Sequence, residues 1–156
     1  QRNGAHVVTL PIARENPVVK TTAWMTVRKP SQDSLPPDVY EGILRSPDGR
    51  LLEGMSSNFY AVVDGVLFTA GEGVLAGITR RAVLEIAAEL LPVRMDAPRV
   101  EDIPRFEEAL ITSSGRGVVP VTRIDGQPVA SGAVGPIVRE LRARYDRWTE
   151  EHSEPI

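Results

Sequence analysis

The sequence contains no cysteine and only two histidines, and this composition limits the catalytic and metal-binding sites that it can form. Without cysteine, these residues can form no disulfide, no catalytic thiolate and no cysteine-ligated zinc site. His6 and His152 stand near opposite ends of the sequence, so no Ser–His–Asp triad suggests itself. A lone histidine is more often structural or solvated than catalytic. Neither a Walker loop nor a GxGxxG loop occurs, and we predict no metal site.

The charge and the apolar pattern exclude two further classes of protein. The net charge is −3, with no basic excess to indicate nucleic-acid binding and no basic amphipathic helix to indicate a membrane surface. No apolar run approaches the roughly 20 residues that span a bilayer. The composition, 42% hydrophobic and 25% charged over 156 residues, is typical of a single globular domain, so we expect a cytoplasmic protein.

Strands are predicted where β-branched and apolar residues cluster between turn residues. The predicted strands are 6–12, 40–45, 50–53, 59–63, 66–69, 93–97, 109–112 and 118–121. Asp64-Gly65 and Asp125-Gly126 are strong signals for tight hairpin turns. The pattern therefore predicts a β-rich core.

Helices are predicted where apolar residues recur at helical spacing. The predicted helices are 21–29, 79–91, an acidic one at 100–108 and a terminal one at 136–152. Pro30 is expected to end the first helix, and Arg80, Arg81 and Glu85 are expected to face outward from the second. The order of the elements is that of one α+β, or mixed α/β, domain over 1–156.

Three segments stand out together: "EGMSSNFYAVVDGVLFTA" at 53–70, "GVLAGITRRAVLEIA" at 73–87 and "EEALITSSGRGVVPV" at 107–121. They resemble the signature of the class IV aminotransferases, which have an "EGxxxN" strand, a hairpin, a "GITR" turn opening a helix and a strand–loop–strand ending in "PV". The order and the spacing agree with the family from about Val18 to the last helix. One such motif is weak evidence, but three in order are specific.

The resemblance implies a fold type IV pyridoxal 5'-phosphate enzyme. Residues 1–156 would be its larger, C-terminal, cofactor-binding domain, with a β-rich core and surrounding helices. The family's smaller N-terminal domain has no counterpart in this chain, so we expect the natural protein to be longer. Family members are typically homodimers that act on a small amino acid and a 2-oxo acid.

The family's Schiff-base lysine ends an extended segment before the "EG" glutamate, and Lys20 in "NPVVKTT" fits that place. Lys29 in "VRKPS" is the alternative, although it lies closer to the glutamate than the family pattern has it. A lysine in an apolar pocket has a lowered pKa and becomes nucleophilic. Lys20 could otherwise be a surface lysine.

The resemblance also assigns the groups that would hold the ring. Glu53 would pair with the protonated pyridine nitrogen and keep the ring an electron sink, whereas an isolated glutamate after a hairpin would merely be solvated. Leu75 would pack on the ring, or else belong to an ordinary core.

The phosphate cradle is predicted at the start of the second helix. Gly77-Ile78-Thr79 opens the helix, and the amides of Ile78 and Thr79 with the Thr79 hydroxyl lie at its N-terminus, which favours anions. Thr79 could also simply cap the helix. Ser114 occupies the place where many relatives have a phosphate-binding threonine.

Arg116 is a candidate anchor for a substrate carboxylate, with Ser113 beside it, or else a solvated loop arginine. Many family aminotransferases carry a tyrosine five residues after the lysine, but this chain has Met25 there, with Trp24 beside it. The favoured function is transamination through a Schiff base with Lys20. Two alternatives stay open: an aminodeoxychorismate lyase that eliminates pyruvate, and a non-catalytic cofactor-binding fragment.

Overall fold

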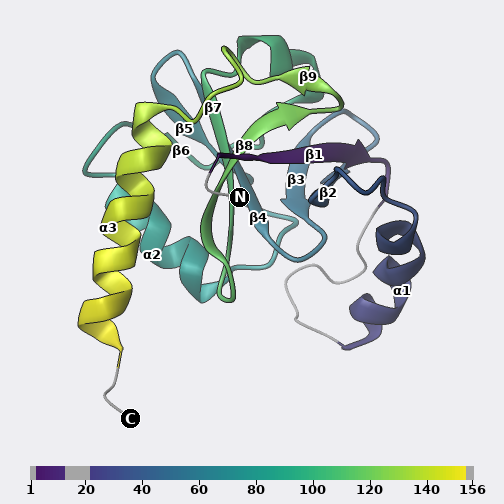
Figure 1. The fold of residues 1–156 in the computed structure, drawn as a ribbon, viewed down its shortest axis with the longest axis horizontal. Coiled ribbons are helices and arrows are strands. Elements are labelled where there is room, and N and C mark those ends of the chain that lie inside the picture. The colour runs from purple at the N-terminus through teal and green to yellow at the C-terminus, as the bar shows by residue number, and fades with distance from the viewer. Residues whose placement is uncertain (1–2, 13–21, 154–156) are drawn as a thin grey trace.

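In the part of the chain that the structure describes, a single mixed sheet of nine strands forms the centre (Figure 1). The computed structural model describes residues 3–12 and 22–153. Its elements in chain order are β1 (Ala5–Leu10), α1 (Thr22–Asp33), β2 (Glu41–Arg45), β3 (Leu51–Gly54), β4 (Asn58–Val63), β5 (Val66–Phe68), α2 (Ile78–Ala87), β6 (Val93–Arg94), the 3-10 helix η1 (Val100–Arg105), β7 (Glu108–Ser113), β8 (Gly117–Ile124), β9 (Gln127–Pro128) and α3 (Pro136–His152).

Six of the strands close into a barrel. The strand order is β3-β2-β1-β8-β7-β4, and a β3–β4 pairing joins the two ends. Strand β1 runs parallel to both neighbours, β2 and β8, while the other barrel pairs are antiparallel. Strands β5 and β6 extend the sheet beyond β4. This mixed barrel with helices around it confirms the α/β character and the β-rich core expected from the sequence.

Alternate side chains of the central strands enter two different cores. On β4, Phe59 and Ala61 belong to one apolar cluster with Ile111 of β7, whereas Tyr60 and Val62 belong to another. Successive side chains of a strand point to opposite faces, so burial on both faces produces a run that is apolar throughout. This explains why every residue of β4 is buried.

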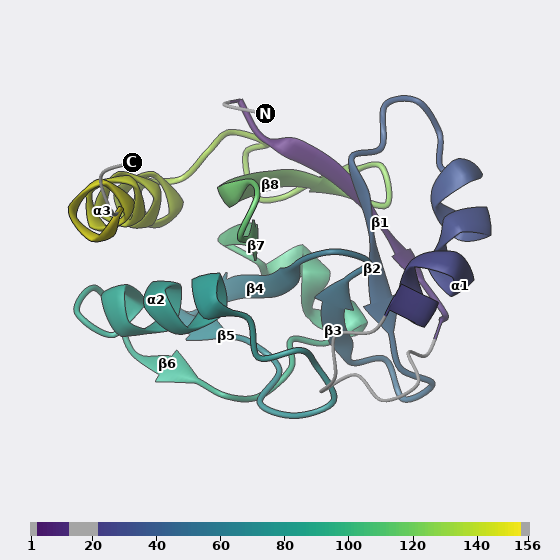
Figure 2. The same cartoon turned by 90° about the horizontal axis from the view of Figure 1, so that it is seen from below.

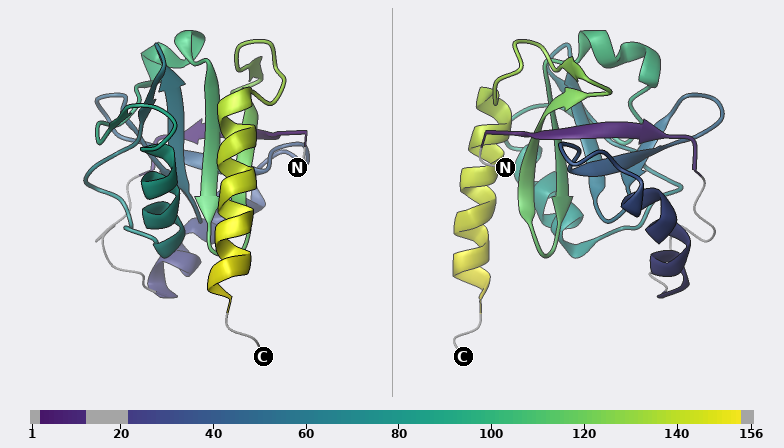
Figure 3. Two further views of the ribbon diagram at one scale, coloured as in Figure 1. Left: turned by 90° about the vertical axis from the view of Figure 1, so that its left-hand side faces the viewer. Right: turned by 45° about the vertical axis from the view of Figure 1, so that its right-hand side comes forward.

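Helices α2 and α3 lie side by side against one face of the sheet, as Figure 2 and the left view of Figure 3 show. Val83 of α2 and Leu141 of α3 are fully buried there. Glu108, at the start of β7, accepts hydrogen bonds from the amides of Ile137 and Val138 and so caps the N-terminus of α3.

Helix α1 lies apart from α2 and α3, and it packs Trp24 against Leu44 and Met55. None of the helices in 22–153 has both the length and the apolarity that crossing a membrane requires.

The two predicted hairpin turns are confirmed. Asp64 and Gly65 both have positive φ, 50° and 74°, and so do Asp125 and Gly126, at 50° and 81°. Two consecutive residues of positive φ form the turn whose twist matches that of the flanking strands.

Three predictions about the helices are wrong in part. Helix α1 continues through Pro30 to Asp33, and the Pro30 carbonyl accepts a hydrogen bond from Ser34. The acidic segment forms only the short 3-10 helix η1, because the chain must enter strand β7 at Glu108. Arg80 does not face outward: it is 8% exposed, because its guanidinium turns back toward the segment before the helix and donates to the Ala70 carbonyl.

Candidate active site

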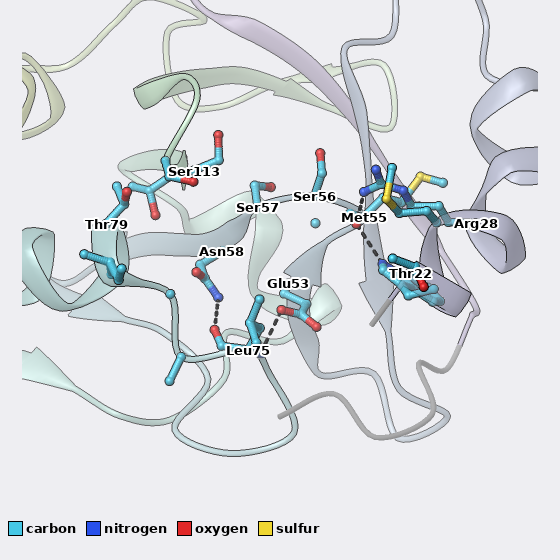
Figure 4. A pocket seen from close by; sticks show the side chains of 18 residues that line it. Thr22, Arg28, Glu53, Met55, Ser56, Ser57, Asn58, Leu75, Thr79 and Ser113 are labelled. Atoms are coloured by element: carbon cyan, nitrogen blue, oxygen red, sulfur yellow. Dashed lines mark hydrogen bonds between the residues drawn. The ribbon is translucent and has the colours of Figure 1, made fainter. Parts of the chain in front are cut away.

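A cavity of about 780 Å³ opens between the barrel, α1 and the N-terminus of α2 (Figure 4). Its walls come from four parts of the chain: α1, the segment 53–58, the turn 75–79 and the end of β7 at 112–114. The volume lies in the range of cavities that hold a cofactor with a small substrate. Six residues assigned from the resemblance line it, together with Ser113: Glu53, Leu75, Gly77, Ile78, Thr79 and Ser114.

Of the two lysines in the sequence, the structure describes only Lys29. Lys20 lies outside the described residues, so its role stays a prediction. Lys29 has a side chain 70% exposed, and its ammonium group donates to both carboxylate oxygens of Asp33 at 2.9 Å. Lys29 is not among the described residues that line the cavity. An exposed ammonium paired with Asp33 outside the cavity is poorly placed to attach a cofactor there, so Lys20 stays the predicted covalent lysine.

Glu53 is a buried carboxylate in the wall of the cavity. Its side chain is 2% exposed at the end of β3, and its Oε2 accepts a hydrogen bond from the Leu75 amide at 3.0 Å. The Leu75 carbonyl in turn accepts from the Asn58 side-chain amide at 2.8 Å. The peptide groups of Leu75 are therefore held from both sides, and the turn that leads into α2 is fixed to the barrel.

Asn58 was not predicted as a site residue, although it is the asparagine of the "EGxxxN" pattern. It lines the cavity, and its Oδ1 would lie 3.3 Å from a Cβ placed on Gly77. The lack of a side chain at Gly77 therefore lets the turn pack closely on Asn58. Gly54 is more tightly constrained, because its added Cβ would collide with the Ser57 hydroxyl and lie 3.0 Å from the Glu41 carboxylate.

The N-terminus of α2 opens into the cavity without a side-chain cap. The helix begins at Ile78, one residue earlier than predicted, and its N-cap is Gly77, which has no side chain to accept from the first amides. Amides of a first helical turn have no acceptor within the helix. The Thr79 hydroxyl is 3.3 Å from the Tyr145 hydroxyl. This end of the cavity thus presents amide and hydroxyl donors, the chemistry that binds an anion.

The end of β7 contributes hydroxyl groups beside α2. Ser113 and Ser114 line the cavity, as does Thr112, whose hydroxyl is 2.8 Å from the hydroxyl of the fully buried Tyr60. Burial raises the pKa of Tyr60 well above its usual value, so the phenol stays protonated and a donor. The Tyr60–Thr112 pair fixes the end of β7.

Arg116 holds the loop after β7 against the barrel. Its guanidinium donates to the Glu41 carboxylate at 3.1 Å, to the Ser56 carbonyl at 3.0 Å and hydroxyl at 2.8 Å, and to the Ser113 hydroxyl at 2.9 Å. It also lies over the Tyr40 ring. Burial alone would lower the pKa of Arg116, but the neighbouring Glu41 carboxylate raises it above its usual value.

Arg116 is not among the described residues that line the cavity. Its donors are directed at protein acceptors, so this structure presents it as a brace of the loop, and its role as a substrate anchor stays a prediction. The partner, Glu41, was not anticipated, since a glutamate at the start of a predicted strand is not distinguishable from a surface charge.

We expect Glu41→Ala to lower the free energy of unfolding by about 3 kcal/mol, because it removes one partner of a largely buried ion pair. Glu41 is 4% exposed and also accepts from the Ser56 amide and the Ser57 hydroxyl. The control is Glu101→Ala, which breaks an exposed pair with Arg99 and should cost less than about 1 kcal/mol. Urea unfolding measures both. Equal losses of unfolding free energy in the two variants would show that the Glu41–Arg116 pair stabilises the fold no more than an exposed ion pair does.

Comparison with known families settles the broad class. Residues 3–124 match the family model described as amino-transferase class IV. The chain belongs to this family. Class IV relatives include the D-alanine aminotransferase of Staphylococcus aureus (strain COL), 38% identical over 104 residues, and that of Bacillus licheniformis, 38% identical over 98 residues. These matches cover 65% and 61% of this chain.

Solved class IV structures share the fold over nearly the whole chain. The branched-chain amino acid aminotransferase of T.th. with pyridoxamine 5'-phosphate superimposes with a TM-score of 0.84 at 27% identity, covering 94% of this chain. The same enzyme with N-(5'-phosphopyridoxyl)-L-glutamate gives a TM-score of 0.87 at 26% identity, covering 97%. This chain spans 37% and 35% of the two D-alanine aminotransferases, and 51% and 54% of the two solved chains.

Proposed function

We propose that this protein is a pyridoxal-phosphate-dependent aminotransferase that moves an amino group between an amino acid and a 2-oxo acid. The observation that carries the proposal is the composition of one cavity. A buried carboxylate, Glu53, lies between an uncapped helix N-terminus and an arginine-bearing helix, α1. The family membership and the relatives' activities, on D-alanine and on branched-chain amino acids, support the same class of reaction.

The donor set of the cavity fits pyridoxal phosphate. A phosphate needs several donors around it, and the first turn of α2 with the Ser114 hydroxyl offers them. A protonated pyridine nitrogen needs a carboxylate shielded from water, and Glu53 is 2% exposed. When bound, the cofactor would supply the electron sink that stabilises negative charge at the substrate Cα.

The chain's own residues then have distinct tasks. Lys20 would attach the cofactor covalently and, once freed, move the proton at the substrate Cα. Glu53 would hold the proton on the ring nitrogen, and its bond to the Leu75 amide would keep its carboxylate in place. Leu75 would pack against the ring, and the cavity walls would exclude water from it.

A lyase that releases pyruvate from aminodeoxychorismate remains the second candidate. Met25 favours it, because this residue lines the cavity and is 58% exposed at the position where many family aminotransferases have tyrosine. Assays of the full-length protein with amino acids and 2-oxoglutarate, and separately with aminodeoxychorismate, distinguish the two reactions. We expect turnover in the first assay. Cofactor absorbance with turnover in neither would point to a non-catalytic relative.

We further propose that residues 1–156 act as the larger, cofactor-binding domain of a homodimeric cytoplasmic enzyme, with a smaller N-terminal domain covering the cavity. The family membership supports this arrangement, as does the length of the relatives, of which this chain spans 35–37% for the two D-alanine aminotransferases. Sedimentation of the full-length protein tests the dimer directly.

The phosphate assignment predicts a loss of cofactor affinity. Thr79→Ala combined with Ser114→Ala removes two hydroxyl donors but leaves the amides of α2 in place. Hydrogen bonds to a charged group contribute roughly 1.5–3 kcal/mol each, so the dissociation constant of pyridoxal phosphate should rise at least about tenfold. Fluorescence titration measures it, with Thr149→Ala as the control, because the Thr149 hydroxyl lies on α3 outside the cavity lining and donates to the Asp146 carbonyl. Unchanged affinity in the double variant would place the phosphate elsewhere.

A further inference from the structure

Arg28 is the single cation among the described residues that line the cavity. Its Nη1 donates to the Met55 carbonyl at 2.7 Å. Within 3–12 and 22–153, no carboxylate lies within ion-pair distance of it, whereas Arg116 pairs with Glu41. A guanidinium has five N–H donors, and a main-chain carbonyl occupies one of them without balancing the charge. Arg28 therefore presents positive charge and unused donors to the cavity.

The position of Arg28 is set by the packing of α1. Trp24 lies four residues earlier, on the same face of the helix, and is 8% exposed in a core with Leu44 and Met55. The Trp24 indole donates to the same Met55 carbonyl, at 2.9 Å. One carbonyl thus ties both side chains to the wall of the cavity. A side chain held in this way loses little conformational entropy when it binds a ligand.

Arg28 and the N-terminus of α2 lie at opposite ends of the cavity. Figure 4 shows Thr79 and Ser113 at one end, Arg28 and Thr22 at the other, and Glu53 between them. One end offers amides and hydroxyls, the chemistry that suits a phosphate. The other offers a planar guanidinium, the geometry that suits a carboxylate bonded through both oxygens. The cavity therefore has a separate place for a second anion.

We propose that Arg28 binds a carboxylate group of the substrate and thereby selects amino acids and 2-oxo acids over amines that lack a carboxylate. This inference rests on the proposed function, because it places the substrate beside a cofactor whose phosphate lies at α2. The carboxylate is either the one on the substrate Cα or one on its side chain. Both have the same chemistry, and ligands with one or two carboxylates distinguish them.

The binding experiment uses Arg28→Gln in the full-length protein loaded with pyridoxal phosphate. Calorimetry measures the dissociation constants of two unreactive acids, 4-methylvalerate with one carboxylate and glutarate with two. We expect binding to weaken about 10- to 100-fold, the size expected when a charged hydrogen bond is lost. Weakening of both acids assigns Arg28 to the Cα carboxylate, and weakening of glutarate alone assigns it to a side-chain carboxylate. Unchanged binding of both acids overturns the proposal.

Two further variants separate anchoring from folding. Arg94→Gln removes an exposed arginine on β6 and should leave the binding of both acids within about twofold, the usual insensitivity of an exposed surface site. Arg28→Lys keeps the charge but loses the planar guanidinium that can bind both oxygens of a carboxylate. It should therefore weaken binding less than Arg28→Gln does. If Arg28→Gln fails to fold, as judged by its urea midpoint, Arg28→Lys becomes the deciding variant. Wild-type affinity in Arg28→Lys would then overturn the proposal.

The reactions of two amino donors show whether the carboxylate-binding role of Arg28 or the proposed transamination fails. In Arg28→Gln the KM for an amino acid should rise about 10- to 100-fold. The half-reaction with 1-phenylethylamine, which has no carboxylate, should keep its wild-type rate when it is followed in a single turnover without a 2-oxo acid. If the wild type turns over no donor but Arg28→Gln still loses carboxylate binding, the proposed function fails and the anchor stands. If the wild type transaminates and the KM is unchanged in Arg28→Gln, the anchor fails and the function stands.

Discussion

Replacement of Glu53 by glutamine should slow transamination about 100- to 1000-fold while the cofactor stays bound. A neutral amide cannot keep the pyridine nitrogen protonated, and loss of such charge stabilisation commonly raises a barrier by a few kcal/mol. The local structure should persist, because the glutamine oxygen can still accept from the Leu75 amide that Glu53 now binds at 3.0 Å. The effect should therefore appear in kcat, with little change in the dissociation constant of the cofactor.

The control for this variant is Glu85→Gln, an exposed carboxylate on α2 paired with Arg81. It removes the same charge at a place away from the cavity lining and should leave kcat unchanged. Stopped-flow measurement of proton abstraction, with an amino acid deuterated at Cα, isolates the affected step. A Glu53→Gln variant with the wild-type rate would refute the assigned role of this carboxylate.

Lys20→Ala should lower the turnover number about 10⁴-fold, the upper range for loss of a positioned proton-transfer group. The same variant should lose the covalent attachment of the cofactor. Lys29→Ala is the matched control, because Lys29 is the other lysine of the sequence and forms an exposed ion pair with Asp33. It should retain activity within about twofold, as exposed pairs contribute little. The reverse pattern would move the covalent site to Lys29.

The local structure of the chain was predictable from its sequence because it depends on neighbouring residues. Two hairpin turns follow from Asp-Gly pairs that tolerate positive φ, and strand β4 follows from its apolar run. The closure of the barrel does not follow from any local pattern. It depends on the parallel pairing of β1 with β8, whose partners Ala5 and Val121 are separated by most of the chain.

The lining of the candidate site could be predicted where a family motif is present, but not where only three-dimensional packing brings residues together. Glu53, Leu75 and Thr79 belong to motifs, and they line one cavity. Arg28 and Glu41 carry no motif signal. Their contacts arise because α1 packs against Met55 and because the loop after β7 approaches the start of β2.

Covalent binding of pyridoxal phosphate through Lys20 can be tested by reduction and peptide mapping. The full-length protein is saturated with pyridoxal phosphate, treated with sodium borohydride and digested, and the modified peptide is identified by mass spectrometry. We expect a pyridoxyl group on the peptide that contains Lys20, with Lys29 unmodified. A pyridoxyl group on Lys29, or none on either lysine, would contradict it.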